Sequence, residues 1–410
     1  MKRVVVTGCG GLSPLGHDWA SVEAQLKSGR NAVQCIPQWQ EYDGLNTQVA
    51  APAAAFELPE HYHRKALRSM GRVAILATRA SELALIDAGL LGSALVQSGK
   101  LGISYGSSAG SPASIGDFGR MITEKSTDGI NANTYLKMMS HTAAVNIGVF
   151  FGITGRIVTT SSACTAGSQG IGYAFEAIQS GKQIAMLCGG AEELDATGAA
   201  VFDSLFATST KYNSTPNLTP RPFDAARDGL VLGEGAGSLV LEELEHAKAR
   251  GAFIYAEIIG FGTNSDGRHV TQPNWQTMAE AMRLALAEAK LAPSDIAYVN
   301  GHGTATDHGD IAETAATYSV FGGNIAISTL KSYMGHTLGA CGALECWMTI
   351  QMLRTGWFAP TLNLENIDPR CAPLDYIVGS GRHFEGEFAM SNNFAFGGIN
   401  TSIVLRRWAN

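Results

Sequence analysis

The stretch Ile184-Ala185-Met186-Leu187-Cys188-Gly189 decides the fold class, because it is apolar throughout and ends in glycine. A strand with one face in water alternates polar and apolar residues, whereas a continuous apolar run indicates a strand buried on both faces. Similar runs lie at 4–8 and 102–106, and Ala-rich helical stretches lie at 73–88 and 278–290. The sequence therefore predicts a layered α/β fold with a largely parallel core sheet.

The same succession of elements occurs twice along the chain. The first half has a strand followed by glycines over 4–11, a helix ending near Leu90, and strands that run into Gly106 and Cys164. The second half repeats this order, with a strand at 256–262, a helix ending near Leu291, and strands that run into Gly301 and Lys331. We therefore predict two similar halves, over residues 1–250 and 251–410, whose strand ends meet at one site.

The composition argues against several classes of protein function. Among 410 residues, 45% are hydrophobic and 16% are charged, which is typical of a globular chain with a sizeable core. The net charge of -7 argues against a nucleic-acid partner. The 7 cysteines contain no CxxC pair, which favours reduced thiols over disulfides or a zinc ribbon. No signal peptide or apolar run long enough to cross a membrane occurs, so we expect a cytoplasmic protein without a membrane partner.

Cys164 is the candidate nucleophile. It lies in the segment 160–168, between a predicted strand at 156–159 and a predicted helix at 169–179. The amides and dipole of a helix N-terminus favour thiolate, the reactive form of cysteine. A buried, inert cysteine is the alternative, and we keep that interpretation for Cys9, Cys188, Cys341, Cys346 and Cys371, because no base lies near them in the sequence.

Two glycine-flanked histidines, His302 and His336, follow predicted strands of the second half. A single such histidine is weak evidence, but two of them opposite a cysteine favour a catalytic set. His302, Asp307, His308 and Asp310 crowd together and offer metal ligands as an alternative. The chain lacks HExxH or a similar helical spacing, so we expect no metal.

Three glycine-rich segments have different interpretations. Gly8–Gly11 and 232–237 lack the complete GxGxxG pattern in strand–loop–helix order, so we interpret both as structural turns and expect no dinucleotide cofactor. The segment 392–400 places Phe394 and Phe396 beside two glycines. It is either an ordinary buried aromatic hairpin or a gate with a backbone amide aimed at an oxyanion.

Together these segments resemble the β-ketoacyl-[acyl carrier protein] synthases of the I/II type, within the thiolase superfamily. The resemblance spans essentially the whole chain. It rests on SSAC at 161–164, HGTAT at 302–306, LKSYMGH at 330–336, NNFAFGG at 392–398, and RPFD with RDG at 221–229. It implies a thiolase-like α/β/α/β/α fold of two similar halves, and the decarboxylative condensation of a malonyl unit with an acyl chain.

The resemblance also implies a role for each matching residue. Cys164 carries the acyl chain, and its amide and that of Phe396 form the oxyanion hole. His302 and His336 promote decarboxylation as neutral imidazoles, with Lys331 and Glu313 as their support. Phe396 gates the acyl tunnel beside Phe394, and Thr304 and Thr306 hold the phosphopantetheine arm, so that no further cofactor is needed.

The partner implied is an acyl carrier protein. Arg64, Arg68 and Arg72 share one face of a predicted helix beside Lys65. Lys65 and Arg68 match carrier-contacting positions of the family, although a solvated helix face is the alternative. The resemblance further implies either a homodimer or a heterodimer with a chain-length-factor-like subunit.

Several residues depart from the usual family pattern. They are Leu330, Met334, Asp307, Ala395 and Ile399, while Ala109 is small at a position that blocks the tunnel in some relatives. These departures suggest a specialised ketosynthase, such as one for type II polyketides or aryl polyenes, as an alternative to ordinary fatty-acid synthesis. Two other classes stay open: a non-catalytic partner subunit, and a thiolase-like enzyme or hydrolase acting on coenzyme A thioesters.

Overall fold

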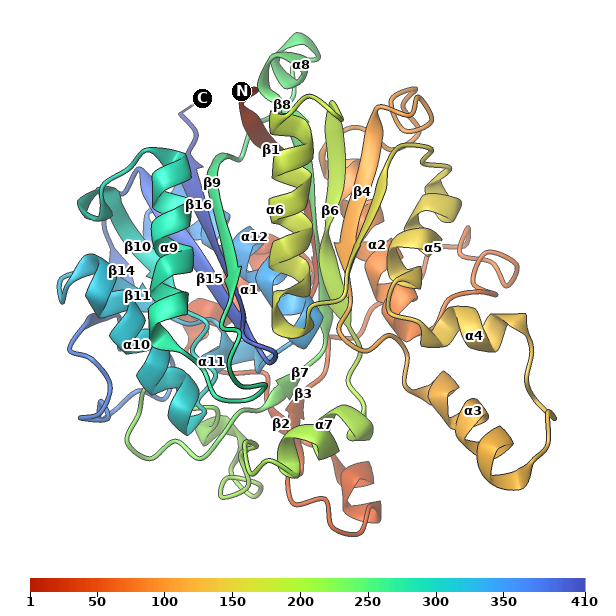
Figure 1. The fold of residues 1–410 in the computed structure, drawn as a ribbon, viewed down its shortest axis with the longest axis horizontal. Helices are drawn as coiled ribbons and strands as arrows, with labels where there is room; N and C mark the ends of the chain where they lie inside the picture. The colour runs from red at the N-terminus through yellow and green to blue at the C-terminus, as the bar shows by residue number, and fades with distance from the viewer. Residues whose placement is uncertain (410) are drawn as a thin grey trace.

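One mixed sheet of eleven strands runs through the computed structural model, which describes residues 1–409 (Figure 1). From one edge to the other the strands are β13 (Asp375–Tyr376), β11 (Ala326–Ser328), β10 (Ile296–Asn300), β15 (Phe388–Ala395), β16 (Ile399–Arg407), β9 (Ala256–Ser265), β1 (Val4–Leu12), β8 (Gly235–Glu243), β6 (Ala185–Glu192), β4 (Leu101–Gly106) and β5 (Ile157–Thr160). A short antiparallel pairing of β1 with β9 joins two half-sheets.

The two half-sheets have the same order of pairings, as the internal repeat predicts. Outward from the centre, each has two antiparallel pairings followed by two parallel ones: β1-β8-β6-β4-β5 in the first and β9-β16-β15-β10-β11 in the second, where β13 adds a third parallel pairing at the edge. The expectation of a largely parallel sheet is therefore wrong. Helices cover both faces of the central antiparallel strands too, so most of their residues are buried on either face and burial does not reveal strand direction.

Helices complete five layers, which run from left to right in Figure 1. The outer layers are α9 (Trp275–Ala289) with α10 (Asp307–Phe321), and α2 (Arg72–Asp87) with α5 (Thr142–Phe151). Between the half-sheets lie α6 (Ala166–Gln179) and α12 (Cys341–Thr355), which pack against each other. This arrangement confirms the expected α/β/α/β/α fold and buries α12 on all sides.

The first two glycine-rich segments are strands, which corrects their interpretation as turns. Gly8–Gly11 lies inside β1, and the segment 232–237 forms β7 (Leu232–Gly233) and the start of β8. A Cβ at Gly8 or Gly10 would lie 2.4 Å from a carbonyl oxygen of α2. These glycines therefore let helices approach the sheet closely, and do not reverse the chain.

The predicted helix carrying Arg64, Lys65 and Arg68 is also wrong. Residues 64–69 form turns, and α2 begins only at Arg72. The Arg72 side chain is paired with the carboxylate of Glu234, 2.5 Å away. Gly71, which precedes α2, separates these turns from the helix, and the charge spacing alone did not reveal this.

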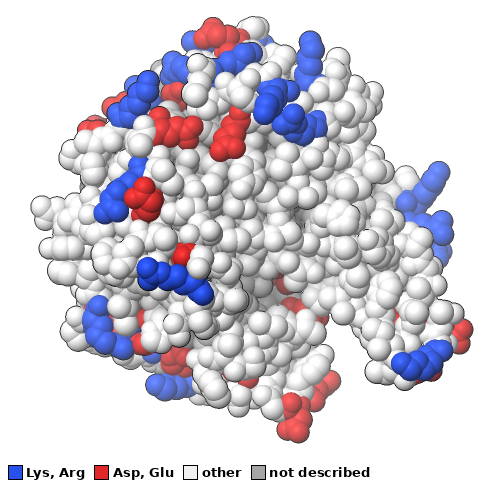
Figure 2. All heavy atoms as spheres, viewed as in Figure 1, with Lys and Arg blue, Asp and Glu red and all other residues white. Residues whose placement is uncertain are grey.

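The remaining elements lie around this core. They are α1 (Trp19–Ser28), α7 (Ala196–Asp203), α8 (Leu244–Ala249), α11 (Lys331–Met334), the small sheets β2–β3–β7 (Gln34–Cys35, Val49–Ala51) and β12–β14 (Trp357–Phe358, Arg382–His383), and the arm of α3 (Ala113–Glu124) and α4 (Ala132–Met138). The arm stands away from the body, and charges of both signs lie at its tip (Figures 1 and 2). Among residues 1–409, the helices are too short or too polar to span a membrane.

Candidate active site

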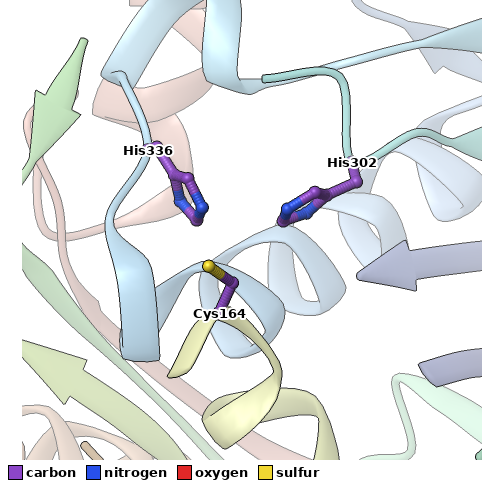
Figure 3. Close-up of side chains that lie close together, drawn as sticks. All are labelled: Cys164, His302 and His336. Atoms are coloured by element: carbon purple, nitrogen blue, oxygen red, sulfur yellow. The ribbon is translucent and has the colours of Figure 1, made fainter. Parts of the chain in front are cut away.

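Cys164 lies on a strained turn between β5 and α6, where the sequence places it. The 3-10 turn Ala163–Thr165 directly precedes α6, and Ala163 has a left-handed φ of 50°. A left-handed backbone is costly for a residue with a Cβ, and such strain is concentrated at functional turns. The turn aims the sulfur of Cys164 at the second half of the chain (Figure 3).

The two histidines reach Cys164 from separate loops of the second half. His302 follows β10, as predicted, whereas His336 follows the single helical turn α11 and not a strand. One ligand atom of each of Cys164, His302 and His336 lies within 4.8 Å of the other two. The imidazole planes are nearly perpendicular, at 89°, with centroids 5.0 Å apart. The fold thus brings together three residues separated by up to 172 positions (336 − 164).

The three side chains line a cavity of about 410 Å³. Aromatic side chains of the hairpin β15–β16 and the hydroxyls of Thr304 and Thr306 line the same cavity. The side chains of Cys164, His302 and His336 are nearly inaccessible, with at most 5% of each residue exposed. A substrate that reaches them is therefore largely removed from water.

Burial dominates the ionisation of this group. It raises the pKa of Cys164 to about 11, although the Lys331 cation and the amides of Phe396 and Cys164 oppose it. The expected preference for thiolate is thus outweighed by desolvation in the free protein. Burial also holds the pKa of both histidines well below the ordinary value, with help from Lys331. Both imidazoles are therefore neutral at pH 7.

Hydrogen bonds fix which nitrogen of each imidazole carries the proton. The amide of Leu338 donates to Nδ1 of His336 over 3.1 Å. The side-chain amide of Asn393 lies 3.3 Å from Nδ1 of His302, in position to donate. Since Nδ1 accepts in both rings, Nε2 carries the hydrogen. Both rings thus present an N–H donor to a ligand in the cavity.

Two buried carboxylates support these loops. Glu313 accepts hydrogen bonds from the amides of His302 (2.5 Å) and Gly303 (2.6 Å), so it holds the loop backbone. Lys331 forms its ion pair with Glu345 of α12. Burial disfavours the Lys331 cation, but Glu345 and other neighbours outweigh this and raise its pKa.

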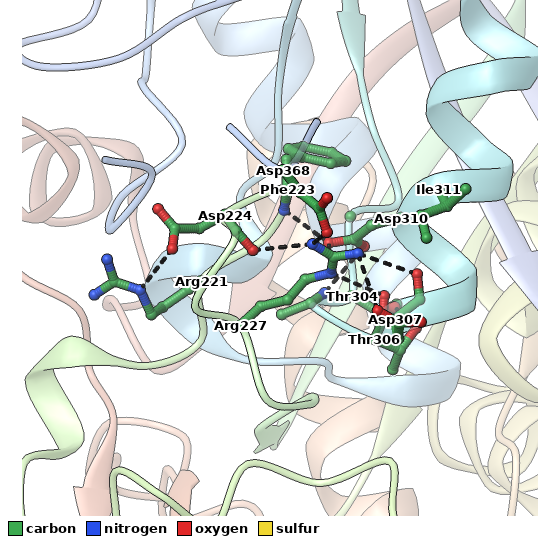
Figure 4. Close-up of polar contacts among 12 residues, drawn as sticks. Arg221, Phe223, Asp224, Arg227, Thr304, Thr306, Asp307, Asp310, Ile311 and Asp368 are labelled. Carbon is green, nitrogen blue, oxygen red and sulfur yellow. Dashed lines mark hydrogen bonds and ion pairs between the residues drawn. The ribbon is translucent and has the colours of Figure 1, made fainter. Parts of the chain in front are cut away.

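A network of charged side chains supports the loop that carries Thr304 and Thr306 (Figure 4). The two threonine hydroxyls are 2.8 Å apart. Arg227 donates to the carbonyl of Thr306 and pairs with Asp368 at 2.6 Å, while Asp310 accepts from the amides of Phe223 and Ala305. Burial raises the pKa of Asp310 to about 6. The RPFD and RDG segments therefore support the cavity wall.

The aromatic hairpin forms as predicted. Phe394 lies in β15 with its ring 6.1 Å from that of His302, and Phe396 lies on the turn to β16. The ring of Phe396 packs on Phe202 of α7, 5.2 Å away. The backbone amide of Phe396 acts on the sulfur of Cys164 and lowers the pKa of its thiol, and its role as an oxyanion donor stays a prediction.

Three predicted site residues lie on the surface. Ala109 is exposed after β4, and its amide donates to Glu192 over 3.0 Å. Lys65 and Arg68 are exposed on the turns before α2. The tunnel role of Ala109 and the docking role of Lys65 and Arg68 stay predictions.

Sequence reasoning missed Glu345 and assigned no role to Asn393. Both are completely or almost completely buried, and Asn393 donates to Glu345 over 2.8 Å. The sequence did contain a signal for Glu345, because it is the single charged residue in the stretch 341–353. A charge in such an apolar helix is buried and requires a partner. Asn393 lies in the NNFAFGG segment but resembled a structural strand residue.

Comparisons with known proteins agree with this geometry. The chain matches the models "Beta-ketoacyl synthase, N-terminal domain" over residues 1–247 and "Beta-ketoacyl synthase, C-terminal domain" over 255–365. It is 37% identical to 3-oxoacyl-[acyl-carrier-protein] synthase 1 of Escherichia coli K12, with 99% of each chain covered.

Two solved structures extend the comparison. A beta-ketoacyl synthase from Burkholderia phymatum STM815 has 59% identity and a TM-score of 0.98, with both chains fully covered. A type II polyketide ketosynthase in complex with its acyl-carrier protein has 29% identity and a TM-score of 0.88, also over both full chains. The chain belongs to the β-ketoacyl synthase family.

Proposed function

We propose that the chain is a β-ketoacyl-[acyl carrier protein] synthase of fatty-acid biosynthesis, an acyltransferase that forms a carbon–carbon bond. The observation that carries this is the convergence of Cys164, His302 and His336 on one cavity. The curated relative named above is a 3-oxoacyl-[acyl-carrier-protein] synthase over its full length.

The first step loads the acyl chain. The sulfur of Cys164 attacks the acyl thioester, and the amides of Cys164 and Phe396 stabilise the oxyanion. The thiol of the carrier's arm departs and takes the proton that Cys164 loses. With a pKa of about 11, the Cys164 thiol keeps its proton until the substrate arrives, so that proton is available for the departing thiol.

The second step joins the two units. The malonyl carboxylate leaves as carbon dioxide, and its bonding electrons form an enolate that the Nε2–H groups of His302 and His336 stabilise. Neutral donors suit this work, because they hold the enolate oxygen without protonating its carbon. The enolate carbon attacks the thioester on Cys164, which releases the β-ketoacyl chain on the carrier and the Cys164 thiolate, and a proton from water converts the thiolate back to the thiol. The substrates supply every atom of the β-ketoacyl product, so we propose that no cofactor takes part.

The carrier protein is the proposed partner, since a solved relative is a complex with an acyl-carrier protein. Its arm would run past Thr304 and Thr306, and its body would contact Lys65 and Arg68. We also propose a dimer through β5, an edge strand whose Ile157 is exposed, and through the arm, where apolar side chains such as Ile122 are exposed as well. A cytoplasmic location fits the seven free thiols.

The test follows carrier-protein masses after the protein is mixed with malonyl-carrier and either octanoyl-carrier or an aryl-primed polyene-carrier, with Cys164→Ala as the control. Condensation with octanoyl-carrier supports fatty-acid elongation. Condensation with the aryl substrate alone assigns the chain to a specialised pathway. Product from neither, with a homodimer confirmed by light scattering, contradicts the proposal.

A further inference from the structure

Glu192, at the end of β6, is a buried carboxylate for which the reaction above has no use. It is 1% exposed and accepts four hydrogen bonds. The donors are Ser107 Oγ (3.0 Å) and the amides of Ser108 (2.6 Å), Ala109 (3.0 Å) and Gly339 (3.0 Å). Glu192 thus ties the loop after β4 in the first half to a turn of the second half.

That turn, residues 337–340, together with Cys341 directly after it, contacts both His336 and Cys164. Its Leu338 amide donates to Nδ1 of His336 over 3.1 Å. The next residue, Cys341, donates its S–H to the carbonyl of Cys164 over 3.2 Å. A displacement of this turn would therefore move His336 relative to the sulfur that it serves.

The turn is also strained. Leu338 has a left-handed φ of 46°, a conformation that is unfavourable for a residue with a Cβ. A Cβ at Gly339 would lie 2.7 Å from Glu192 and 2.8 Å from the amide of Ser108, so the turn lies directly against the first half. Strained backbone persists only where its surroundings enforce it, and the Glu192 carboxylate is the charged group that does so here.

We propose that Glu192 is a positioning residue that anchors the turn 337–340, so that His336 keeps its tautomer and its place beside Cys164. The proposal rests on the condensation proposed above. All four partners of Glu192 are donors, so the carboxylate fits them, whereas a glutamine would direct an NH₂ group at one of the amides. Burial raises the pKa of Glu192 to about 7, and the four donors counteract this rise.

The test compares Glu192→Gln with Glu193→Gln. Glu193 is the neighbouring carboxylate, and it accepts from Ser111 and Val73 instead of the turn. We expect Glu192→Gln to lower kcat about 100-fold, as a displacement of about 1 Å does, with KM changed less than about threefold. Glu193→Gln should keep kcat within about twofold of the unmodified protein.

A second measurement separates positioning from general stability. Histidine labelled with ¹⁵N reports the tautomer of His336 in the free protein, without any turnover. Glu192→Gln should move the Nδ1 signal of His336 away from that of an unprotonated acceptor nitrogen. A folded Glu192→Gln with kcat within about twofold of the unmodified protein, or with a lowered kcat and an unchanged His336 signal, overturns the proposal.

If Glu192→Gln does not fold, Glu192→Asp keeps the charge but shortens the reach, and the same two measurements and outcomes apply. Failure of the unmodified protein to condense any substrate would contradict the proposed function alone. The ¹⁵N signal would still decide whether Glu192 fixes His336.

Discussion

The ammonium group of Lys331 and the carboxylate of Glu345 form an ion pair with both side chains at most 1% exposed, and its cation acts on the imidazoles of His302 and His336. Asn393 extends this pair by donating to Glu345, and its amide also lies beside Nδ1 of His302. The cation helps to keep both imidazoles neutral, so the pair links the stability of the core to the chemistry of the cavity.

Removal of one partner of the Lys331–Glu345 ion pair should destabilise the protein strongly. We expect Glu345→Gln to destabilise the protein by about 3–5 kcal/mol in urea unfolding, because Lys331 is left buried and unpaired. The double variant Lys331→Met with Glu345→Met should regain most of that stability but not the condensation rate. Recovery of both, or a small loss in the single variant, would contradict this account.

The reactivity of Cys164 should depend steeply on pH. With a pKa of about 11, the thiolate fraction at pH 7 is small and rises about tenfold per pH unit. The rate of alkylation by iodoacetamide, followed by mass on Cys164, should therefore keep rising from pH 7 to pH 10. Cys164→Ala identifies any background modification. A plateau below about pH 9 would mean that the helix amides and Lys331 outweigh burial.

Replacement of Arg227 by Met should lower the free energy of unfolding far more than replacement of Arg370 by Met. Arg227 is buried between Asp368 and Asp310, whereas Arg370 is exposed and shares Asp368 with it. We expect Arg227→Met to cost about 3–5 kcal/mol in urea unfolding, since it leaves the buried Asp310 without its cation, whereas Asp368 keeps Arg370. It should also raise KM for the carrier-borne substrate, because the Thr306 carbonyl loses a donor. Equal effects of Arg227→Met and Arg370→Met would refute this difference.

The hydroxyl of Thr304 should affect substrate binding more than turnover. Loss of one hydrogen bond of about 1 kcal/mol predicts that Thr304→Val raises KM for malonyl-pantetheine about fivefold, with little change in kcat. Thr154→Val, at an exposed site distant from the cavity, serves as the control. A fall in kcat at constant KM would assign Thr304 to the chemical step instead.

Charge reversal at Lys65 and Arg68 should weaken the binding of carrier-borne substrates only. Both side chains are exposed, so Lys65→Glu with Arg68→Glu should fold normally and raise KM for acyl-carrier. Acyl-pantetheine, which has no carrier protein, should be used as before. The matched double reversal Lys182→Glu with Lys290→Glu, at exposed positions elsewhere, should leave both substrates unaffected. The same KM for acyl-carrier in both double variants would rule out docking at Lys65 and Arg68.

Several local features could be predicted well from the sequence. The strands β1, β4 and β6, the helices α2 and α9, and the aromatic hairpin around Phe396 all form where apolar runs and glycines indicate them. The predictions failed where one pattern suits two structures. Glycines inside β1 resemble a turn, and regularly spaced arginines before α2 resemble a helix face.

The sequence by itself determined the family, the layered fold, and the identity of Cys164, His302 and His336, because these depend on residue type and local spacing. The tertiary structure alone decided which buried charges pair. Lys331 pairs with Glu345, Glu313 holds a loop backbone, and Glu192 links the two halves. Such partners lie on separate elements, and a buried charge is satisfied by whichever donor the packing brings within hydrogen-bond distance, which spacing along the chain does not specify.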